Sequence, residues 1–366
     1  MIADTAALRA IGWPFAGAPD DSGTGRTWAA CMEAHPGARP ARVIEQHRSG
    51  YAVAEGPEQA TRVESPPDWQ RPRCPPEQRA AVGDWVLVDG GVIVALLPRY
   101  TAIKRSAAGE HYRQQLIAAN VDTVLVVCGL DADFNLRRIE RYLLMLRADG
   151  VRMVVVLTKA DRSDDVAGNI ALLSELIAQG VPVLAVNAKD RASVASLDPW
   201  LGPGVTAVLV GSSGAGKSTL TNTLLGVEKM KTGEVRASDA RGRHTTTHRA
   251  LIPLPTGACL IDTPGMRELK PTGEEDLVEG GFADVEVIAE ACRFRDCAHQ
   301  REPGCAVRAA LEAGTLDAAR YANYRKLSDE VSIAADKLAQ RRAQDAAARP
   351  PGKSLSRRLD EKHGRH

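Results

Sequence analysis

The stretch "GVTAVLVGSSGAGKST" (204–219) decides the fold. An apolar run typical of a buried strand leads into a loop with the pattern G-x-x-x-x-G-K-S, which begins at Gly211 and ends at Ser218, and a helical pattern follows. Strand, glycine loop and helix in this order form the context of a phosphate-binding P-loop. The glycines let consecutive backbone amides turn toward phosphate groups, and the helix N-terminus adds partial positive charge.

The P-loop residues are expected to hold the phosphates of a nucleotide. Lys217 should reach the β- and γ-phosphates, and the Ser218 hydroxyl should ligate Mg²⁺. The loop alone does not name the nucleotide, because transport ATPases and small-molecule kinases carry similar loops. The residues assigned to phosphate binding are Gly211, Ser212, Ser213, Gly214, Ala215, Gly216, Lys217, Ser218 and Thr219.

Two further segments indicate a GTPase. "LIDTPG" (260–265) places Asp262 at the end of a strand, where its carboxylate can hold Mg²⁺ through water. The Gly265 amide can sense the γ-phosphate, as in the Asp-X-X-Gly of switch II. Between this motif and the P-loop lies "GRHTTTHR" (242–249), whose three threonines stand where switch I should contribute a hydroxyl to Mg²⁺.

A guanine-reading motif comes earlier in the chain. "VVVLTKADR" (154–162) contains Thr158, Lys159, Ala160 and Asp161, which is close to the Asn-Lys-X-Asp motif. The carboxylate of Asp161 can accept hydrogen bonds from N1–H and the 2-amino group of guanine, whereas adenine would leave a polar group unpaired, at about 1–3 kcal/mol. Lys159 would lie along the base. In an ordinary GTPase this motif follows the P-loop, but here it precedes Gly211 by 50 positions.

The remaining patterns predict a multidomain α/β protein. The following units are expected: a loosely ordered extension at 1–37, a β-barrel at 38–104, the nucleotide domain at 105–275, a helical metal domain at 276–340 and a basic tail at 341–366. An OB-fold is one candidate for the barrel, and another small β-domain remains open. Strands that alternate with helices from 105 onward predict a parallel sheet covered on both faces.

Composition limits the function classes. The chain has 366 residues, 44% hydrophobic and 25% charged, with a net charge of +1, so any nucleic-acid surface must be local. No apolar run is long enough to span a membrane, and the N-terminus does not resemble a secretory signal. We therefore expect a cytoplasmic protein whose seven cysteines need not pair. From Lys337 onward, nine Lys/Arg stand against three Asp/Glu, a composition that suits contact with nucleic-acid phosphates or a solvated tail.

A cysteine-histidine cluster predicts a zinc site. "CRFRDCAHQREPGC" (292–305) contains Cys292, Cys297, His299 and Cys305. Three thiols and one imidazole suit tetrahedral Zn²⁺ in a closed structural site. The spacing is not the common C-x-x-C, so unconnected thiols beside a solvated histidine form the alternative.

The segment "VNAKD" (186–190) follows the next strand, where GTPases often place Ser-Ala against the guanine oxygen, and we call it the base loop. The order of the motifs (guanine reader, base loop, P-loop, switch I, switch II) resembles that of circularly permuted GTPases. With a β-domain before it and a Cys/His cluster after it, the chain resembles the ribosome small-subunit-dependent GTPase A (RsgA) family. The resemblance implies an N-terminal OB-fold, a central permuted P-loop GTPase domain and a C-terminal zinc domain. It also implies a monomer that binds the 30S subunit and 16S rRNA in late maturation and hydrolyses GTP to GDP when stimulated by that subunit.

The sequence departs from the usual GTPase pattern at several positions. Thr158 stands where asparagine is usual, so weaker nucleotide affinity is expected, and Asn187 stands where serine is usual before Ala188. Met266 occupies the position from which a glutamine often orients the attacking water. Similar proteins carry a histidine at His244, which is our candidate for that role. An ATP-dependent kinase or transport ATPase, and a binding module without turnover, are the alternatives.

Overall fold

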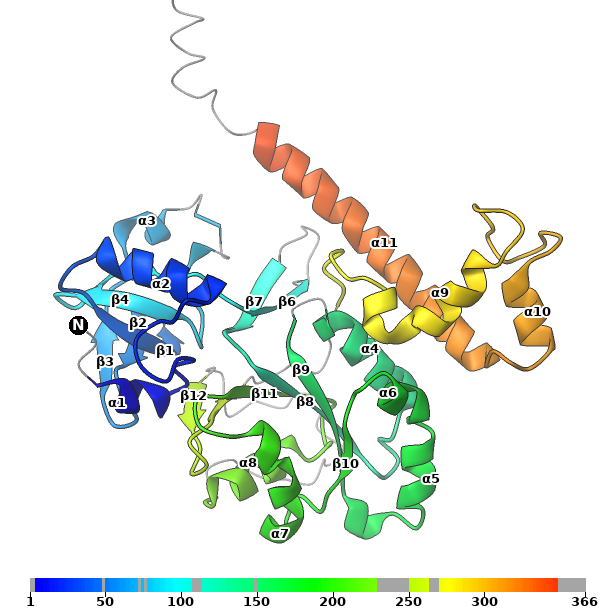
Figure 1. Cartoon of the computed structure of the whole chain (residues 1–366), viewed down its shortest axis with the longest axis horizontal. Helices are drawn as coiled ribbons and strands as arrows, with labels where there is room; N and C mark the ends of the chain where they lie inside the picture. The colour runs from blue at the N-terminus through cyan, green and yellow to red at the C-terminus, as the bar shows by residue number, and fades with distance from the viewer. Residues whose placement is uncertain are drawn as a thin grey trace, which may run out of the picture.

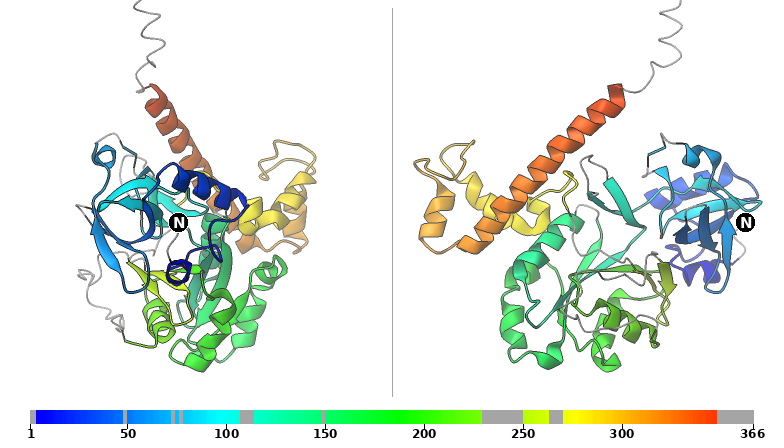
Figure 2. Two further views of the ribbon diagram at one scale, coloured as in Figure 1. Left: turned by 60° about the vertical axis from the view of Figure 1, so that its left-hand side comes forward. Right: turned by 180° about the vertical axis from the view of Figure 1, so that it is seen from behind.

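The protein forms three connected parts, seen at the left, centre and right of Figure 1. The computed structural model describes residues 4–47, 50–71, 74–75, 78–106, 114–147, 150–228, 250–262 and 270–347. A β-rich N-terminal part adjoins a central α/β part, and a helical part follows. Helix α11 (Ala318–Ala347) extends away from the body, as the rear view in Figure 2 also shows.

The N-terminal β region has the strand connectivity of a small Greek-key barrel. Strand β1 pairs antiparallel with β2 and β4, β2 pairs with β3, and β4 pairs with β5. A parallel bridge between Glu64 and Val92 brings the end of β3 to the start of β5. This order supports the OB-fold among the candidates. The elements are β1 (Arg39–His47), β2 (Gly50–Ala54), β3 (Ala60–Val63), α3 (Pro67–Gln70), β4 (Trp85–Asp89) and β5 (Val92–Leu96).

The expectation of a loosely ordered extension at 1–37 is wrong for the part that the structure describes. Residues 4–37 contain α1 (Thr5–Arg9) and α2 (Gly23–Glu33). Trp13 and Trp28 are fully buried, and their rings lie 5.2 Å apart, with Trp85 of the barrel 4.8 Å from Trp13. Aromatic burial of this kind fixes the segment on the barrel. The tryptophans follow no helical or strand period, which is why the sequence pattern missed them.

Arg42 joins this segment to the rest of the molecule. Its guanidinium is fully buried and donates hydrogen bonds to the carbonyl oxygens of Ile11 (2.8 Å), Gly83 (3.1 Å) and Asn120 (3.1 Å). These carbonyls belong to the N-terminal segment, the barrel and the entrance to the α/β part. Several carbonyl acceptors offset the desolvation of the buried charge. Arg42 therefore connects the three segments at one point.

The central part is a parallel sheet, as predicted. Strand β8 pairs parallel with β9 and β11, β9 with β10, and β11 with β13, while β12 pairs antiparallel with β13. The strands are β8 (Thr123–Gly129), β9 (Arg152–Thr158), β10 (Val183–Ala185), β11 (Thr206–Val210), β12 (Ala250–Pro253) and β13 (Cys259–Asp262). The carboxyl ends of the parallel strands consequently meet at one edge of the sheet.

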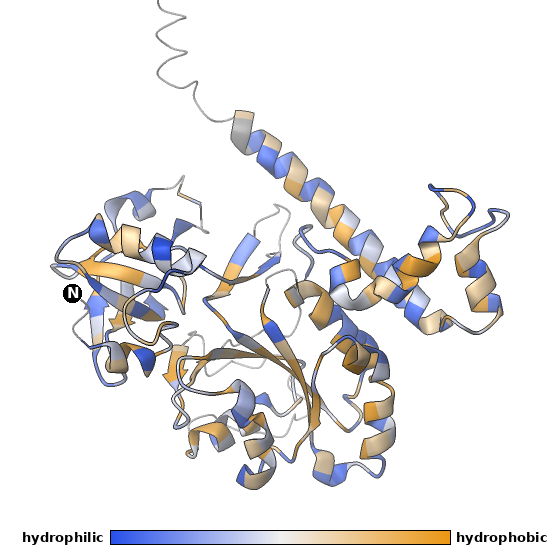
Figure 3. Cartoon of the chain, viewed as in Figure 1, coloured by the Kyte–Doolittle hydropathy of each residue, from blue (hydrophilic) through white to orange (hydrophobic). Residues whose placement is uncertain are grey.

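The apolar run at 154–157 is buried on both faces. Val155 and Leu157 belong to the core that includes Leu143 of α4, whereas Val154 and Val156 belong to the core that includes Leu220 of α8. Figure 3 shows the apolar strands between the helices. The helices of this part are α4 (Leu136–Arg147), α5 (Val166–Ala171), α6 (Ser174–Ala178), α7 (Arg191–Val194) and α8 (Lys217–Leu225), with 3₁₀ turns at η2 (Ala160–Arg162) and η3 (Ala195–Trp200).

The barrel and the parallel sheet are continuous, which the sequence did not indicate. Strand β1 of the barrel also pairs with β12 at Glu45 and Ala250. A separate hairpin of β6 (Ala102–Ser106) and β7 (Gln114–Ala119) connects the two parts. The boundary expected between residues 104 and 105 falls inside β6, and the other domain limits stay predictions.

The C-terminal helices are held to the central part by a buried charge network. Arg320 of α11 is 8% exposed and donates to Glu140 of α4 (2.9 Å) and to Asp284 of α9 (2.7 Å). Asn323 donates to the other carboxylate oxygen of Glu140 at 2.6 Å. Tyr324 is also buried, and its hydroxyl donates to Glu286 of α9. The elements are η4 (Val278–Phe282), a π-helical turn, α9 (Ala283–Glu290), α10 (Ala306–Glu312) and α11.

Among the described residues, no helix has both the length and the apolar character needed to cross a membrane.

Candidate nucleotide site and metal centre

The P-loop connects β11 to α8 and has the backbone that its glycines permit. Gly211, Gly214 and Gly216 have φ angles of 150°, 83° and 92°, which side-chain-bearing residues rarely adopt. A Cβ atom at Gly211 would lie 2.1 Å from the Val127 carbonyl oxygen. The loop therefore needs glycine both for its conformation and for its close approach to β8.

Lys217 is directed back over the P-loop. Its ammonium group donates to the carbonyl oxygen of Gly211 at 2.7 Å and to that of Ser212. The charge is thus held where phosphate oxygens would bind, at the N-terminus of α8. Cation and helix dipole together make this end of the sheet suitable for a polyanion.

The guanine-reading motif lies directly beside the P-loop. Thr158 ends β9 fully buried, and its hydroxyl donates to the Ala215 carbonyl oxygen at 2.6 Å, across 57 positions of sequence. Lys159 follows with a left-handed φ of 61°, and Ala160 begins a 3₁₀ turn in which Asp161 is exposed. The replacement of the usual asparagine by threonine therefore keeps a hydrogen bond to the P-loop.

The base loop after β10 is hydrogen-bonded to the guanine-reading motif and to helix α8, which follows the P-loop. The Ala160 amide donates to the Val186 carbonyl oxygen at 3.3 Å, and the Thr223 hydroxyl of α8 donates to the Ala188 carbonyl oxygen at 2.6 Å. The side-chain oxygen of Asn187 accepts the Lys189 amide at 3.0 Å, which closes a local turn. The structure thus brings reader, base loop and P-loop together at one edge.

The switch residues are only partly described. Asp262 ends β13, which is the neighbour of the P-loop strand β11 in the sheet. The switch I segment with His244 and its threonines, together with Gly265 and Met266, lies outside the described residues.

Sequence reasoning missed two acidic residues after β8. Asp131 forms an ion pair with the Lys159 ammonium group at 2.5 Å, and Asp133 accepts a hydrogen bond from the Ser212 hydroxyl. Although partial burial opposes ionisation, the hydrogen bond and charge of Lys159 lower the pKa of Asp131 below its usual value. The available signal was "DAD" (131–133) directly after a buried strand, since polar residues at strand ends meet at the same sheet edge.

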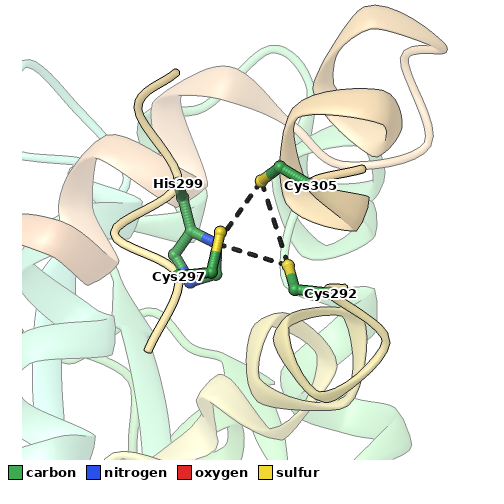
Figure 4. A group of neighbouring side chains, drawn as sticks. All are labelled: Cys292, Cys297, His299 and Cys305. Atoms are coloured by element: carbon green, nitrogen blue, oxygen red, sulfur yellow. Dashed lines mark hydrogen bonds between the residues drawn. The ribbon is translucent and has the colours of Figure 1, made fainter. Parts of the chain in front are cut away.

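The cysteine-histidine cluster forms a candidate metal centre between α9 and α10. Cys292, Cys297, His299 and Cys305 each direct one ligand atom to a common point, and these atoms lie within 4.8 Å of one another (Figure 4). His299 has a left-handed φ of 56°, which turns the chain between Cys297 and Cys305. All seven cysteines of the chain are free thiols.

The spacing of these atoms fits a tetrahedral ion. Nδ1 of His299 lies 3.5 Å from the Sγ atoms of both Cys292 and Cys305, and the two sulfurs are 3.9 Å apart. Zinc at its usual bond lengths would place sulfur and nitrogen ~3.5 Å apart and two sulfurs ~3.8 Å apart. Although partial burial opposes ionisation, the backbone amides of Val307 and Ala306 lower the pKa of Cys292, whereas desolvation raises the pKa of Cys297 to about 11.

The fold and the site define a circularly permuted P-loop GTPase: the reader precedes the P-loop in sequence, yet the two meet on one parallel sheet. Residues 96–272 match the family described as RsgA GTPase. A protein of Xanthomonas axonopodis pv. citri (strain 306) named small ribosomal subunit biogenesis GTPase RsgA is 66% identical over 350 residues, covering 96% of this chain and 95% of that protein. One of the same name from Xanthomonas campestris pv. campestris (strain B100) is 66% identical over 346 residues, or 94% of each chain. The chain therefore belongs to the RsgA GTPase family.

Solved structures agree with the fold. YjeQ from Thermotoga maritima matches with a TM-score of 0.57 at 24% identity, over 80% of this chain and 98% of that one. YloQ, described as a circularly permuted GTPase, matches with a TM-score of 0.55 at 22% identity, over 82% and 96%. At these identities the likeness concerns the fold alone.

Proposed function

We propose that the chain binds GTP at the shared edge of β9 and β11, hydrolyses it to GDP and phosphate, and acts on the small (30S) ribosomal subunit during late maturation. The observation that carries the nucleotide assignment is the hydrogen bond from Thr158 to Ala215, because it joins reader and P-loop into one site. The curated relatives named for small-subunit biogenesis support the ribosomal part.

Each residue then has a defined role. Asp161 accepts hydrogen bonds from the guanine edge, and Lys159 lies along the base. The amides of 211–219 and the Lys217 ammonium hold the phosphates. Mg²⁺, held by Ser218 and Asp262, would neutralise phosphate charge. Asp262 leads into Gly265, whose amide is the sensor of the γ-phosphate in this proposal.

His244 is proposed to orient the attacking water, since the Met266 side chain has no donor and only a weakly accepting thioether sulfur. His244→Ala is expected to lower subunit-stimulated turnover by about 10²-fold or more while GDP affinity changes little. Full stimulated turnover in this variant would assign the role to another group.

The cluster of Cys292, Cys297, His299 and Cys305 is proposed to bind one structural Zn²⁺. Its four protein ligands complete a tetrahedron and leave no open position for chemistry. We further propose that the protein is a cytoplasmic monomer that contacts 16S rRNA.

GTP hydrolysis with and without purified 30S subunits tests the proposal, with 50S subunits as control. We expect slow intrinsic turnover, at least about tenfold stimulation by 30S subunits, and none by 50S subunits. Turnover that 30S subunits do not change would refute the ribosomal assignment and leave the GTPase assignment intact. Preference for ATP over GTP would refute the guanine assignment.

A further inference from the structure

The segment between β8 and α4 contacts both halves of the nucleotide site. We call residues 131–135 the brace loop. At its start, Oδ2 of Asp131 lies 2.5 Å from Nζ of Lys159. Gly129 leaves room for this contact, because a Cβ atom there would lie 3.1 Å from the same Nζ atom. The lysine at the end of β9 is thus held by a carboxylate from the loop that follows the neighbouring strand β8.

The brace loop is itself fixed. The Asp133 amide donates to Oδ1 of Asp131 at 3.1 Å, and the Phe134 amide donates to the Asp131 carbonyl oxygen at 2.9 Å, so the loop forms a tight turn. The Asp133 carboxylate accepts from Ser212 of the P-loop and pairs with Arg138 of α4 at 2.5 Å. Helix α4 is in turn anchored by buried Glu140. The turn and these contacts therefore fix the position of the Asp131 carboxylate.

This contact determines what Lys159 can contribute to binding. A free lysine side chain samples many rotamers, and ordering one on ligand binding costs about 0.5–1.5 kcal/mol, equivalent to a two- to twelvefold change in affinity. The ion pair with Asp131 restricts the Lys159 side chain, so less ordering is left for nucleotide binding to impose. The paired carboxylate also neutralises the ammonium charge locally. The pair therefore keeps the alkyl chain of Lys159 alongside the base and does not add a net positive charge there.

We propose that Asp131 is a positioning residue for guanine recognition: it holds Lys159 in the geometry in which the lysine lies along the base. This inference rests on the proposed nucleotide site and adds a residue from outside the reader, the base loop and the P-loop. Asp131 needs no contact with the nucleotide, because it acts through Lys159.

Asp131→Asn in the full-length chain tests the proposal. Asparagine keeps a side-chain oxygen for the Asp133 amide, but it removes the charge and replaces the oxygen that faces Lys159 with an NH2 group, which cannot accept from the ammonium group. We expect GDP affinity, measured by calorimetry at low salt, to fall by about three- to tenfold. Binding of inorganic pyrophosphate, which has no base, is expected to change by less than about twofold. The difference in GDP affinity between wild type and variant should shrink at 0.5 M salt, because both side chains of the pair are partly exposed, at 24% and 36%.

Asp164→Asn is the matched control, since it removes the same charge from an exposed position shortly after the reader. It should leave GDP affinity unchanged. Unchanged or tighter GDP binding by Asp131→Asn would overturn the proposal, as would an equal loss for pyrophosphate, which would place the effect at the P-loop. A wild-type protein that binds no GDP would instead refute the proposed nucleotide site itself, so the two failures are distinguishable.

Discussion

The nucleotide site and the metal centre are assembled in opposite ways. The four side chains of the candidate metal centre lie between positions 292 and 305, and one short turn region brings them together. The nucleotide site draws on segments near 131, 158, 188 and 211, which only the parallel sheet brings to one edge. The metal centre is therefore a property of local chain geometry, whereas the nucleotide site is a property of the fold.

This difference in assembly explains how a chain whose GTPase motifs are circularly permuted can keep the function of the nucleotide site. The order of strands along the chain does not matter to a site at the carboxyl edge of a sheet, as long as β8, β9 and β11 remain neighbours. A site whose residues are neighbours in the sequence does not tolerate such a change in chain order. Disturbing the two sites should consequently give different responses, and the following variants separate them.

Loss of the metal should have the largest effect on stability, and this effect should be confined to the C-terminal part. Cys305→Ser removes one of four ligands, and structural zinc contributes on the order of 10 kcal/mol to the folding of small zinc domains. We expect zinc content, measured by atomic absorption, to fall from about one ion per chain to near zero, with a lower melting temperature of the C-terminal part. GDP affinity should change by less than about threefold, because the two sites share no ligand.

Cys74→Ser is the control for this variant, because Cys74 lies in the barrel loop, away from the cluster. It should retain zinc. A Cys305→Ser protein that keeps its zinc would contradict the assignment of the metal centre.

The charge network between α4 and α11 should show the next largest effect. Arg320→Met leaves Glu140, which is 3% exposed, with only Arg137 and Asn323 as described partners of its carboxylate. Breaking a buried ion pair is strongly destabilising, and with these partners retained we expect a loss of about 2–4 kcal/mol in the free energy of unfolding. Chemical denaturation measures it.

Arg308→Met is the matched comparison, because the Arg308–Glu312 pair is exposed, at 43% and 72%. Its loss should cost less than about 1 kcal/mol. Equal effects of the two substitutions would show that the network does not fasten the C-terminal helices.

Sequence reasoning succeeded where a pattern is local or strictly periodic. The run at 154–157 carries such a pattern, and its strand, β9, is present as expected. The P-loop and the metal cluster depend on spacing alone. The pattern could not show what depends on long-range contacts, such as the burial of Trp13 against Trp85 or the pairing of β1 with β12. The contact of Asp131 with Lys159 could not be predicted for the same reason.

Loss of the hydrogen bond between the reader and the P-loop should have the smallest effect of these changes. Thr158→Val keeps the shape of the side chain but removes the hydrogen bond to Ala215, whose carbonyl oxygen then lacks that donor. We expect a loss of about 1 kcal/mol, seen as a roughly fivefold weaker affinity for GDP. Thr158→Ser retains the hydroxyl and should bind GDP within about twofold of wild type. An unchanged Thr158→Val protein would show that the hydrogen bond does not support the site.

In the proposed function, a reader located before the P-loop recognises guanine in the same site. Asp161→Asn tests it most directly, because an amide can accept from N1–H and donate to the 2-oxygen of xanthine, whereas a carboxylate cannot donate. Competition binding of GDP and XDP to both proteins is the measurement. We expect wild type to prefer GDP and Asp161→Asn to prefer XDP, each by about tenfold or more. An unchanged preference for GDP in the variant would contradict the account, because guanine would then be recognised elsewhere.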